Sequence, residues 1–208
     1  MMGNNVGDIT IGDNRITVTI GNTSFDLSVP GVSDLGIDPS APNFHNYGDI
    51  HILGPTGHFN GVGLLYENLT EQPAPSDFRT NTSGDIKKDG ETSKIFLGTV
   101  RSYKNAQELS VVNVTLDDHW LDPGIVTRTI REVDGQYVII TMGIGNGALP
   151  TLNDLFSGPL WRSEADALAR ETIYEEANGQ YRPDPRQSDD GSEEENDTQS
   201  LEEWLKEN

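Results

Sequence analysis

The sequence predicts an α+β fold, mainly an antiparallel β-sheet with a C-terminal helix packed on it and a disordered acidic tail. Three observations lead to this prediction. Short runs in which apolar and polar residues alternate, separated by turn residues, fill most of the chain before its helical stretch. Helical periodicity follows Ser163. Beyond Pro183 the chain is so rich in Asp, Glu and Ser that it cannot bury enough apolar surface to order itself.

The first thirty residues alternate apolar and polar positions in three runs, at 8–11, 15–20 and 24–29. Glycine-containing turns separate these runs, which indicates a short β-meander. The segment 30–47 is rich in Pro, Ser, Asp and Asn and is expected to be a loop or linker. We therefore divide the chain into an N-terminal β-meander (1–30), a main α+β domain (31–183) and a disordered acidic tail (184–208).

Within the main domain, two short strands are expected at 50–53 and 62–66, around the turn at 54–57. A long polar loop is expected over 70–92, because this stretch contains two prolines and few apolar residues. Two β-rich runs at 94–101 and 109–116 predict a further hairpin.

The strongest local signal is the dipeptide Asp134-Gly135, which is typical of a two-residue hairpin turn. Such a turn pairs Val133 with Gln136 and Arg128 with Thr141. Side chains alternate between the two faces of a sheet, so the pairing also divides the residues of the hairpin between the faces. One face is expected to carry Val126, Arg128, Ile130, Ile139 and Thr141. The other is expected to carry Thr127, Thr129, Arg131, Val138, Ile140 and Met142.

Two helices are expected after this hairpin. Thr151 is followed three residues later by an acid, which indicates a short capped turn, and Ser163 repeats the signal before a longer amphipathic stretch. Asn178-Gly179 ends that helix. In the tail, Leu201, Trp204 and Leu205 return at helical spacing, so residues 200–205 are either a short helix that docks on a protein partner or a frayed end.

The chain carries 34 acidic and 14 basic residues and has a net charge of −20. Residues 1–183 alone keep a net charge of −12, which disfavours nonspecific binding to nucleic acid or to anionic membranes. There is no cysteine, so disulfides and thiolate metal sites are excluded. No long apolar run and no leader-like N-terminus occur, so we expect a soluble protein, cytoplasmic or exported without a cleavable signal peptide, and no membrane partner.

An acidic cluster with one histidine precedes Pro123-Gly124 and comprises Asp117, Asp118, His119 and Asp122. Carboxylates and an imidazole can bind a divalent cation, but this spacing fits no familiar metal motif. A solvated acidic turn is the simpler interpretation. We therefore predict no metal and no cofactor.

His119 is the candidate general acid or base, because histidine titrates near neutrality and neighbouring acids are expected to raise its pKa. Arg128, predicted on an apolar strand face, needs an anionic partner, which is either a structural carboxylate or a substrate oxyanion. Hydroxyl and amide groups that can complete a pocket come from Thr127, Thr141 and Asn153. These five residues form the predicted catalytic site.

Three further histidines, His45, His51 and His58, do not have the spacing of a ligand set, although folding can bring one of them to His119 for two-histidine chemistry of the ribonuclease type. Residues 143–148 match the pattern G-x-G-x-x-A. Pro150 interrupts the helix that a dinucleotide site requires, so these glycines are expected to allow a bulge or a tight turn instead.

The segment 113–153 resembles C-terminal modules of large bacterial secreted proteins of the RHS-repeat and filamentous-haemagglutinin type, which deliver toxin domains. The resemblance rests on an Asn-x-Thr strand, a histidine before Pro-Gly, a Val-x-Arg strand and a Gly-x-Gly exit followed by Asn. Here these positions are Asn113, Thr115, His119, Pro123, Gly124, Val126, Arg128, Gly143, Gly145 and Asn153.

Two functions remain open from the sequence. The first, which the resemblance implies, is a toxin or effector module, possibly hydrolytic, with a cognate immunity protein as partner. RNA as a substrate would require a local basic groove, for which the candidate residues are Arg101, Lys104, Arg128 and Arg131. The second is a non-catalytic binding or adaptor protein that docks a partner through residues 200–205.

Overall fold

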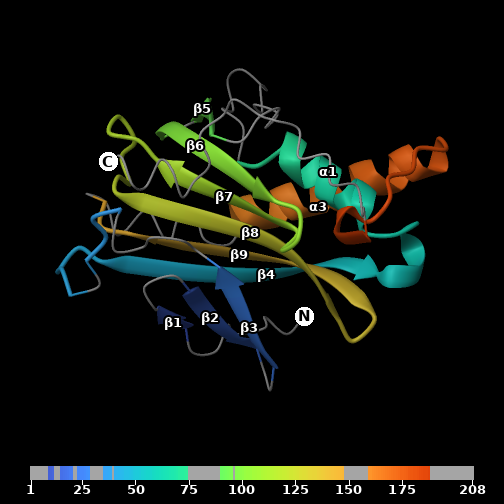
Figure 1. The fold of residues 1–208 in the computed structure, drawn as a ribbon, viewed down its shortest axis with the longest axis horizontal. Coiled ribbons are helices and arrows are strands. Elements are labelled where there is room, and N and C mark those ends of the chain that lie inside the picture. The colour runs from blue at the N-terminus through green and yellow to red at the C-terminus, as the bar shows by residue number, and fades with distance from the viewer. Residues whose placement is uncertain are drawn as a thin grey trace.

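The computed structural model describes residues 9–11, 15–20, 23–28, 35–38, 40–74, 90–95, 97–147 and 159–187. A six-stranded antiparallel sheet forms its centre, with the strand order β4-β9-β8-β7-β6-β5 (Figure 1). The strands are β4 (His45–Pro55), β5 (Glu91–Ile95), β6 (Gly98–Asn105), β7 (Ser110–Thr115), β8 (Gly124–Val133) and β9 (Gln136–Gly145). With α3 (Pro159–Ala177) packed beside β4, the predicted α+β class is confirmed.

The β8–β9 hairpin has the register that the Asp134-Gly135 turn predicted. Val133 pairs with Gln136 and Arg128 pairs with Thr141. Both turn residues have positive φ angles, 51° and 71°, which is the geometry that matches the twist of a hairpin. The predicted assignment of side chains to the two faces of the sheet is therefore confirmed.

The run predicted as one strand at 94–101 is instead the turn region of a β-hairpin. β5 pairs antiparallel with β6, and Ile95 lies opposite Gly98. Gly98 has a φ angle of 139°, and a Cβ atom there would lie only 2.4 Å from the Cα atom of His119. The 116–122 segment therefore packs so closely against the start of β6 that only a glycine fits at position 98, where the chain reverses.

Residues 62–66, predicted as a strand, form the first part of a helix, α1 (Gly63–Glu71). Leu65 and Leu69, one helical turn apart, are both fully buried. A short apolar and aromatic run such as 64–66 fits a strand as well as a buried helix, and contact with α3 decides between them. The two helices are joined by the hydrogen bond from Asn68 Nδ2 to Thr172 Oγ1, 3.0 Å long.

Helix α3 begins at Pro159, earlier than the predicted start at Ser163, and ends beside Gly179, whose φ angle of 82° confirms the predicted stop signal. Short 3₁₀ turns follow β4 (η1, Thr56–His58) and α3 (η2, Pro185–Gln187). Among the described residues, no helix is both long and apolar enough to cross a membrane.

Both faces of the main sheet are buried. The face toward α1 and α3 contributes Val111, Ile130 and Ile139 to a cluster with Leu65, Leu69 and Leu168. The other face carries a second buried cluster, in which sheet residues pack with Ile37. The sheet residues of this cluster are Tyr103, Val112, Val114, Ile125, Val138, Ile140, Met142 and Ile144. The position of β7 between two buried faces explains why all of its residues, Ser110–Thr115, are buried.

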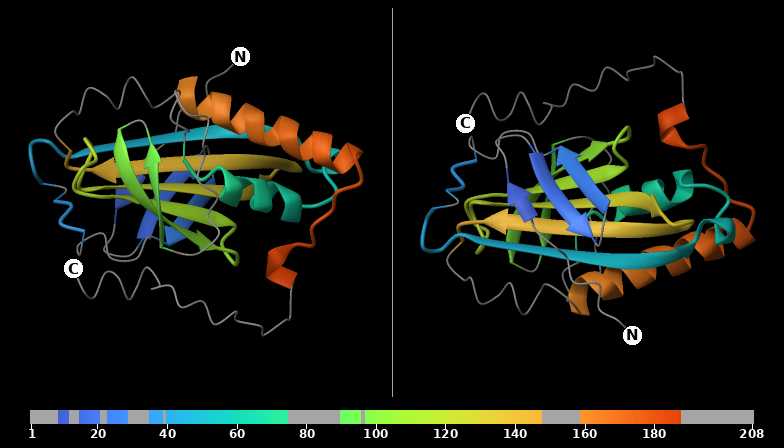
Figure 2. Two further views of the ribbon diagram at one scale, coloured as in Figure 1. Left: turned by 90° about the horizontal axis from the view of Figure 1, so that it is seen from above. Right: turned by 90° about the horizontal axis from the view of Figure 1, so that it is seen from below.

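The predicted N-terminal meander is present as a separate three-stranded sheet of β1 (Ile9–Ile11), β2 (Arg15–Ile20) and β3 (Thr23–Ser28). It lies away from α1 and α3 in Figures 1 and 2. The proposed domain boundaries stay a prediction. The acidic tail from 188 onward, the docking peptide at 200–205 and the short helix at Thr151 all fall outside the described residues.

Candidate functional site

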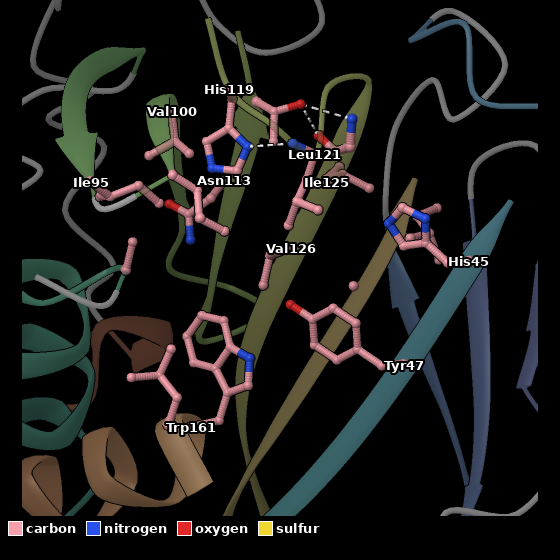
Figure 3. A pocket seen from close by; sticks show the side chains of 17 residues that line it. His45, Tyr47, Ile95, Val100, Asn113, His119, Leu121, Ile125, Val126 and Trp161 are labelled. Carbon is pink, nitrogen blue, oxygen red and sulfur yellow. Dashed lines mark hydrogen bonds between the residues drawn. The ribbon is translucent and has the colours of Figure 1, made fainter. Parts of the chain in front are cut away.

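An apolar cavity lies between the main sheet and the first turn of α3 (Figure 3). Its volume is about 80 Å³, within a larger hollow of about 760 Å³ that includes open solvent at the mouth. Because a single water needs roughly 10–15 Å³ measured in this way, the cavity has room for roughly five to eight waters, or ~150–240 Å³ of liquid. A molecule with one or two small rings fits this space. The lining residues are His45, Tyr47, Ala74, Ile95, Leu97, Val100, Asn113, Thr115, His119, Leu121, Gly124, Ile125, Val126, Gly143, Ile144, Leu160 and Trp161.

The glycines at the end of β9 make room for one wall of the cavity. Tyr47 lies directly opposite Gly143 in the β4–β9 ladder, and its ring covers the glycine. A Cβ atom on Gly143 would lie 2.2 Å from Tyr47 Cε1 and 2.3 Å from Cζ. On Gly145 it would lie 3.2 Å from His45 Nε2. The expected bulge or tight turn is absent here, since the β4–β9 register stays regular through both glycines, which instead give space to side chains from β4.

We expect Gly143→Ala to lower the free energy of unfolding by about 1–3 kcal/mol, because the Tyr47 ring must leave its place on the sheet. The same displacement pushes the ring into the cavity and reduces its volume. Urea unfolding measures the first effect, and Gly57→Ala is the matched control, since a Cβ atom on Gly57 meets nothing within 4 Å. Equal stability of the two variants would contradict this role of Gly143.

Two polar residues in the cavity wall already have hydrogen-bond partners. Asn113 accepts a hydrogen bond from Ser102 Oγ at 2.6 Å and donates one to the Pro73 carbonyl at 2.8 Å. Thr115 Oγ1 accepts a hydrogen bond from the backbone N–H of Gly124 at 2.7 Å and lies 2.8 Å from Asp122 Oδ1, to which it donates. These groups position strands β6, β7 and β8 and leave little free polarity in the wall.

Two ring nitrogens of the wall, Nε2 of His119 and Nε1 of Trp161, are buried without a hydrogen-bond partner among the residues that the structure describes. In His119 the other ring nitrogen is paired, because the backbone N–H of Leu121 donates to Nδ1 at 3.1 Å. Burial lowers the pKa of His119 to about 4, and the nearby Asp118 opposes this shift only in part. The sequence predicted the opposite direction, because it shows the neighbouring acids but not the burial. His119 is therefore a neutral imidazole near pH 7.

Since Nδ1 of His119 accepts a hydrogen bond, the proton of the neutral ring is on Nε2. Figure 3 shows this atom on the side of the ring that is turned away from Leu121 and toward the cavity. His45, the second histidine of the wall, has the opposite arrangement. Its Nδ1 lies 3.2 Å from the Asn43 carbonyl oxygen, an acceptor, so that nitrogen carries the proton of this contact. The two imidazoles thus offer different groups to the cavity.

Arg128 lies beneath the cavity wall and not in it. Its guanidinium donates to the Gln72 carbonyl at 2.7 Å, and its Cζ lies 5.3 Å from the centroid of the Trp161 ring. Burial lowers the pKa of Arg128 to about 10, with Glu164 and Tyr47 opposing the shift. Burial likewise raises the pKa of Tyr47. Among the described residues no carboxylate forms an ion pair with Arg128, so the structural ion pair that was one of its two predicted roles is not observed there, and the substrate oxyanion stays a prediction.

The five predicted catalytic residues do not come together. His119 lines the cavity, whereas Arg128 and its strand partner Thr141 are buried and do not line it. Thr127 lies on the opposite face of the sheet, as alternation along β8 requires. Asn153 falls outside the described residues. The catalytic roles of these residues are not tested by their positions, but of the four that the structure describes only His119 lines the cavity.

The acidic cluster around His119 has structural partners. Asp118 accepts hydrogen bonds from the Thr99 backbone and hydroxyl, at 3.0 and 2.8 Å, which holds the pKa of Asp118 below its usual range. Burial raises the pKa of Asp122, which Thr115 contacts. In the described part of the chain, no group of three or more His, Asp or Glu side chains has the arrangement of a metal site.

The four basic residues considered for a nucleic-acid groove are divided between the two faces of the sheet, since Lys104 is in register with Val111 and Arg128, and Arg101, three positions earlier in β6, lies on the opposite face. Arg128 is buried, and Arg131, three positions further along β8, points to the other face of the sheet. There it pairs with Glu108 through a 2.6 Å contact. The condition set for an RNA substrate is therefore not met by these residues.

Sequence reasoning missed two residues that shape the cavity, Tyr47 and Trp161. Tyr47 was assigned to a loop, and Trp161 precedes the predicted helix start at Ser163. A signal for Trp161 was available, because Pro159 suits the first turn of a helix and would have moved the start toward it. No local signal identifies Tyr47, whose place depends on the glycine opposite it in β9.

No family model matches this chain, and no curated protein does. Solved structures of similar shape include the di-domain ARO/CYC StfQ from the steffimycin biosynthetic pathway (12% identity, TM-score 0.37, 65% of this chain and 52% of that chain). Another is Ara h 8.0201 (9% identity, TM-score 0.35, 64% and 99%). A third is the major latex-like protein 151 from Panax ginseng (10% identity, TM-score 0.33, 64% and 97%). The chain thus spans about half the length of StfQ.

None of these structures is described as a toxin, an effector or a hydrolase, and the expectation of such a module is corrected accordingly. The resemblance of residues 113–153 to secreted modules stays a prediction.

Proposed function

We propose that this protein binds a small, mostly apolar organic molecule in the cavity between the main sheet and α3. The observation that supports the proposal is the cavity itself, with about 80 Å³ of space inside a wall made largely of aliphatic and aromatic side chains. Small-molecule sites are concave and mostly apolar, with a few polar groups that fix the orientation of the ligand. The wall has this composition, because most of its side chains are aliphatic or aromatic. Its amide and hydroxyl groups at Asn113 and Thr115 are already paired within the protein.

Binding of this kind belongs to the non-catalytic class that the sequence offered as its second function. The ligand, however, is a small molecule held by the body of the protein. The sequence proposed a protein partner at 200–205. That docking peptide stays a separate prediction, since it falls outside the described residues.

The proposal is tested by filling the cavity. Val126 on β8 lines it and lies near its centre in Figure 3. We expect Val126→Phe to weaken the binding of naphthalene by at least about tenfold, because the added ring takes the place of the ligand. Transfer of magnetisation from protein methyl groups to naphthalene in ligand-detected NMR measures the binding.

Ile52→Phe is the matched control, because Ile52 is 49% exposed on β4 and does not line the cavity. This variant adds the same aromatic bulk and is expected to bind naphthalene as the unmodified protein does. The proposal fails if the unmodified protein shows no saturable binding of naphthalene, or if both variants bind it equally well.

A further inference from the structure

His119 offers the cavity a hydrogen-bond donor for which the described part of the chain supplies no acceptor. The residue is 6% exposed, and its Nε2 atom is buried without a partner in that part of the chain. Because Leu121 donates to Nδ1, the Nε2 atom of the neutral ring carries the proton. A buried N–H without an acceptor is unfavourable, and native structures rarely retain one without a reason. The acceptor for this proton therefore has to come from the contents of the cavity.

Water is a poor acceptor in this position. A buried water needs two to four polar partners, and the wall near His119 is formed by apolar residues such as Leu97, Val100 and Ile125. The nearest polar side chains of the wall, Asn113 and Thr115, already have partners. A ligand atom that accepts one hydrogen bond and is attached to an apolar body suits this environment better.

The charge around His119 limits the chemistry of that acceptor. Asp118 contributes an electrostatic effect at the imidazole, and Asp117 and Asp118 do so at the neighbouring Asp122. A carboxylate or phosphate on the ligand would be repelled by these acids and would lose its hydration in an apolar cavity. A hydroxyl can accept the hydrogen bond, but its own proton would then need the Nε2 atom of His45, and Figure 3 shows that ring on the other side of the cavity from His119. A neutral carbonyl oxygen satisfies the donor and adds no unpaired group.

We propose that the ligand of this cavity is a neutral apolar molecule with a ketone or ester carbonyl, whose oxygen accepts a hydrogen bond from His119 Nε2–H. This inference rests on the proposed function, because it names the class of molecule that the same cavity binds. His119 is then the residue that determines specificity, and the apolar wall provides most of the contact area.

Two probes of the same shape distinguish the contribution of the carbonyl group to binding from that of the apolar rings. Indane and 1-indanone differ by the replacement of one CH₂ group with C=O, and both are small enough for the cavity. Isothermal titration of the full chain at pH 7 is expected to show that 1-indanone binds roughly tenfold more tightly than indane. In His119→Phe, which removes the donor and keeps a ring of similar size, this preference is expected to disappear.

His45→Phe is the matched control, because His45 also lines the cavity but its Nδ1 proton faces the Asn43 carbonyl. This variant is expected to keep the preference for 1-indanone. The ¹⁵N resonance of His119 Nε2 gives a second measurement on the unmodified protein, which remains decisive if His119→Phe does not fold. It is expected to shift on addition of 1-indanone and to remain in place on addition of indane.

The two proposals fail in different ways. Equal affinities of the unmodified protein for indane and 1-indanone, with an unchanged Nε2 resonance, overturn the carbonyl inference and leave the apolar cavity as a binding site. Retention of the preference in a folded His119→Phe variant overturns it as well. If neither probe nor naphthalene binds, the proposed function itself is wrong.

Discussion

Replacing Arg128 by alanine is expected to lower the free energy of unfolding by about 3–5 kcal/mol. Arg128 is 2% exposed and is among the largest fully buried side chains of the protein. The truncation leaves a cavity under α3, removes the contact with the Trp161 ring and leaves the Gln72 carbonyl without its donor. Urea unfolding followed by circular dichroism measures the change.

Arg128→Met distinguishes the contribution of volume from that of charge. Methionine fills most of the space but carries no charge, and the guanidinium it replaces has no ion pair among the described residues. The cost of burying an unpaired charge offsets much of what its hydrogen bond contributes. We therefore expect Arg128→Met to be more stable than Arg128→Ala by about 2–4 kcal/mol. If both variants lose the same stability, the guanidinium contacts, not the filled volume, hold this region together.

Acidification between about pH 6.5 and pH 4 is expected to destabilise the protein through His119. The pKa of His119 is about 4 in the folded protein, against an ordinary value of 6.5 for histidine. In this interval the unfolded chain binds a proton that the folded protein does not, so the free energy of unfolding falls as the pH falls. Above pH 6.5 both states are neutral and the effect is absent. Its full size is of the order of 3 kcal/mol.

The contribution of His119 is isolated by comparison with His119→Asn, whose side-chain oxygen can still accept the hydrogen bond from the Leu121 backbone. The difference in unfolding free energy between the two proteins is expected to shrink as the pH falls from 6.5 to 4. Buried acids with raised pKa values, Asp122 and Glu164, act in the opposite direction but are common to both proteins. The exposed His58 provides the control variant His58→Asn, for which a difference that depends on pH in the same way would refute the assignment to His119.

Local patterns sufficed for the parts of the fold that depend on neighbours in sequence. The Asp134-Gly135 turn determines the register of β8 and β9, because a two-residue turn leaves only one way to pair the strands. The end of α3 is also predictable from local sequence, because Gly179 just beyond it adopts a positive φ angle that stops a helix. Segments 62–66 and 94–101 were misassigned because their conformation depends on what they contact, α3 for the first and the 116–122 segment for the second.

The candidate site was predicted in part. His119 was identified from its residue type and its place before Pro123-Gly124, and it lies in the cavity wall. Its pKa was predicted in the wrong direction, since the sequence shows three nearby acids and not the burial that outweighs them. Arg128 was correctly placed on the apolar face of β8, yet it packs against Trp161, from a segment distant in sequence, and does not line the cavity.

The sequence by itself determined the α+β class, the register of the central hairpin and the histidine most suited to a site. These follow from turn chemistry, side-chain alternation and residue type, all of which act over a few residues. Only the tertiary structure decided that an apolar cavity exists, that Tyr47 covers Gly143 and that His119 is neutral. Volume and desolvation are properties of the space between elements, and that space is set by the packing of β4, β8, β9 and α3 together.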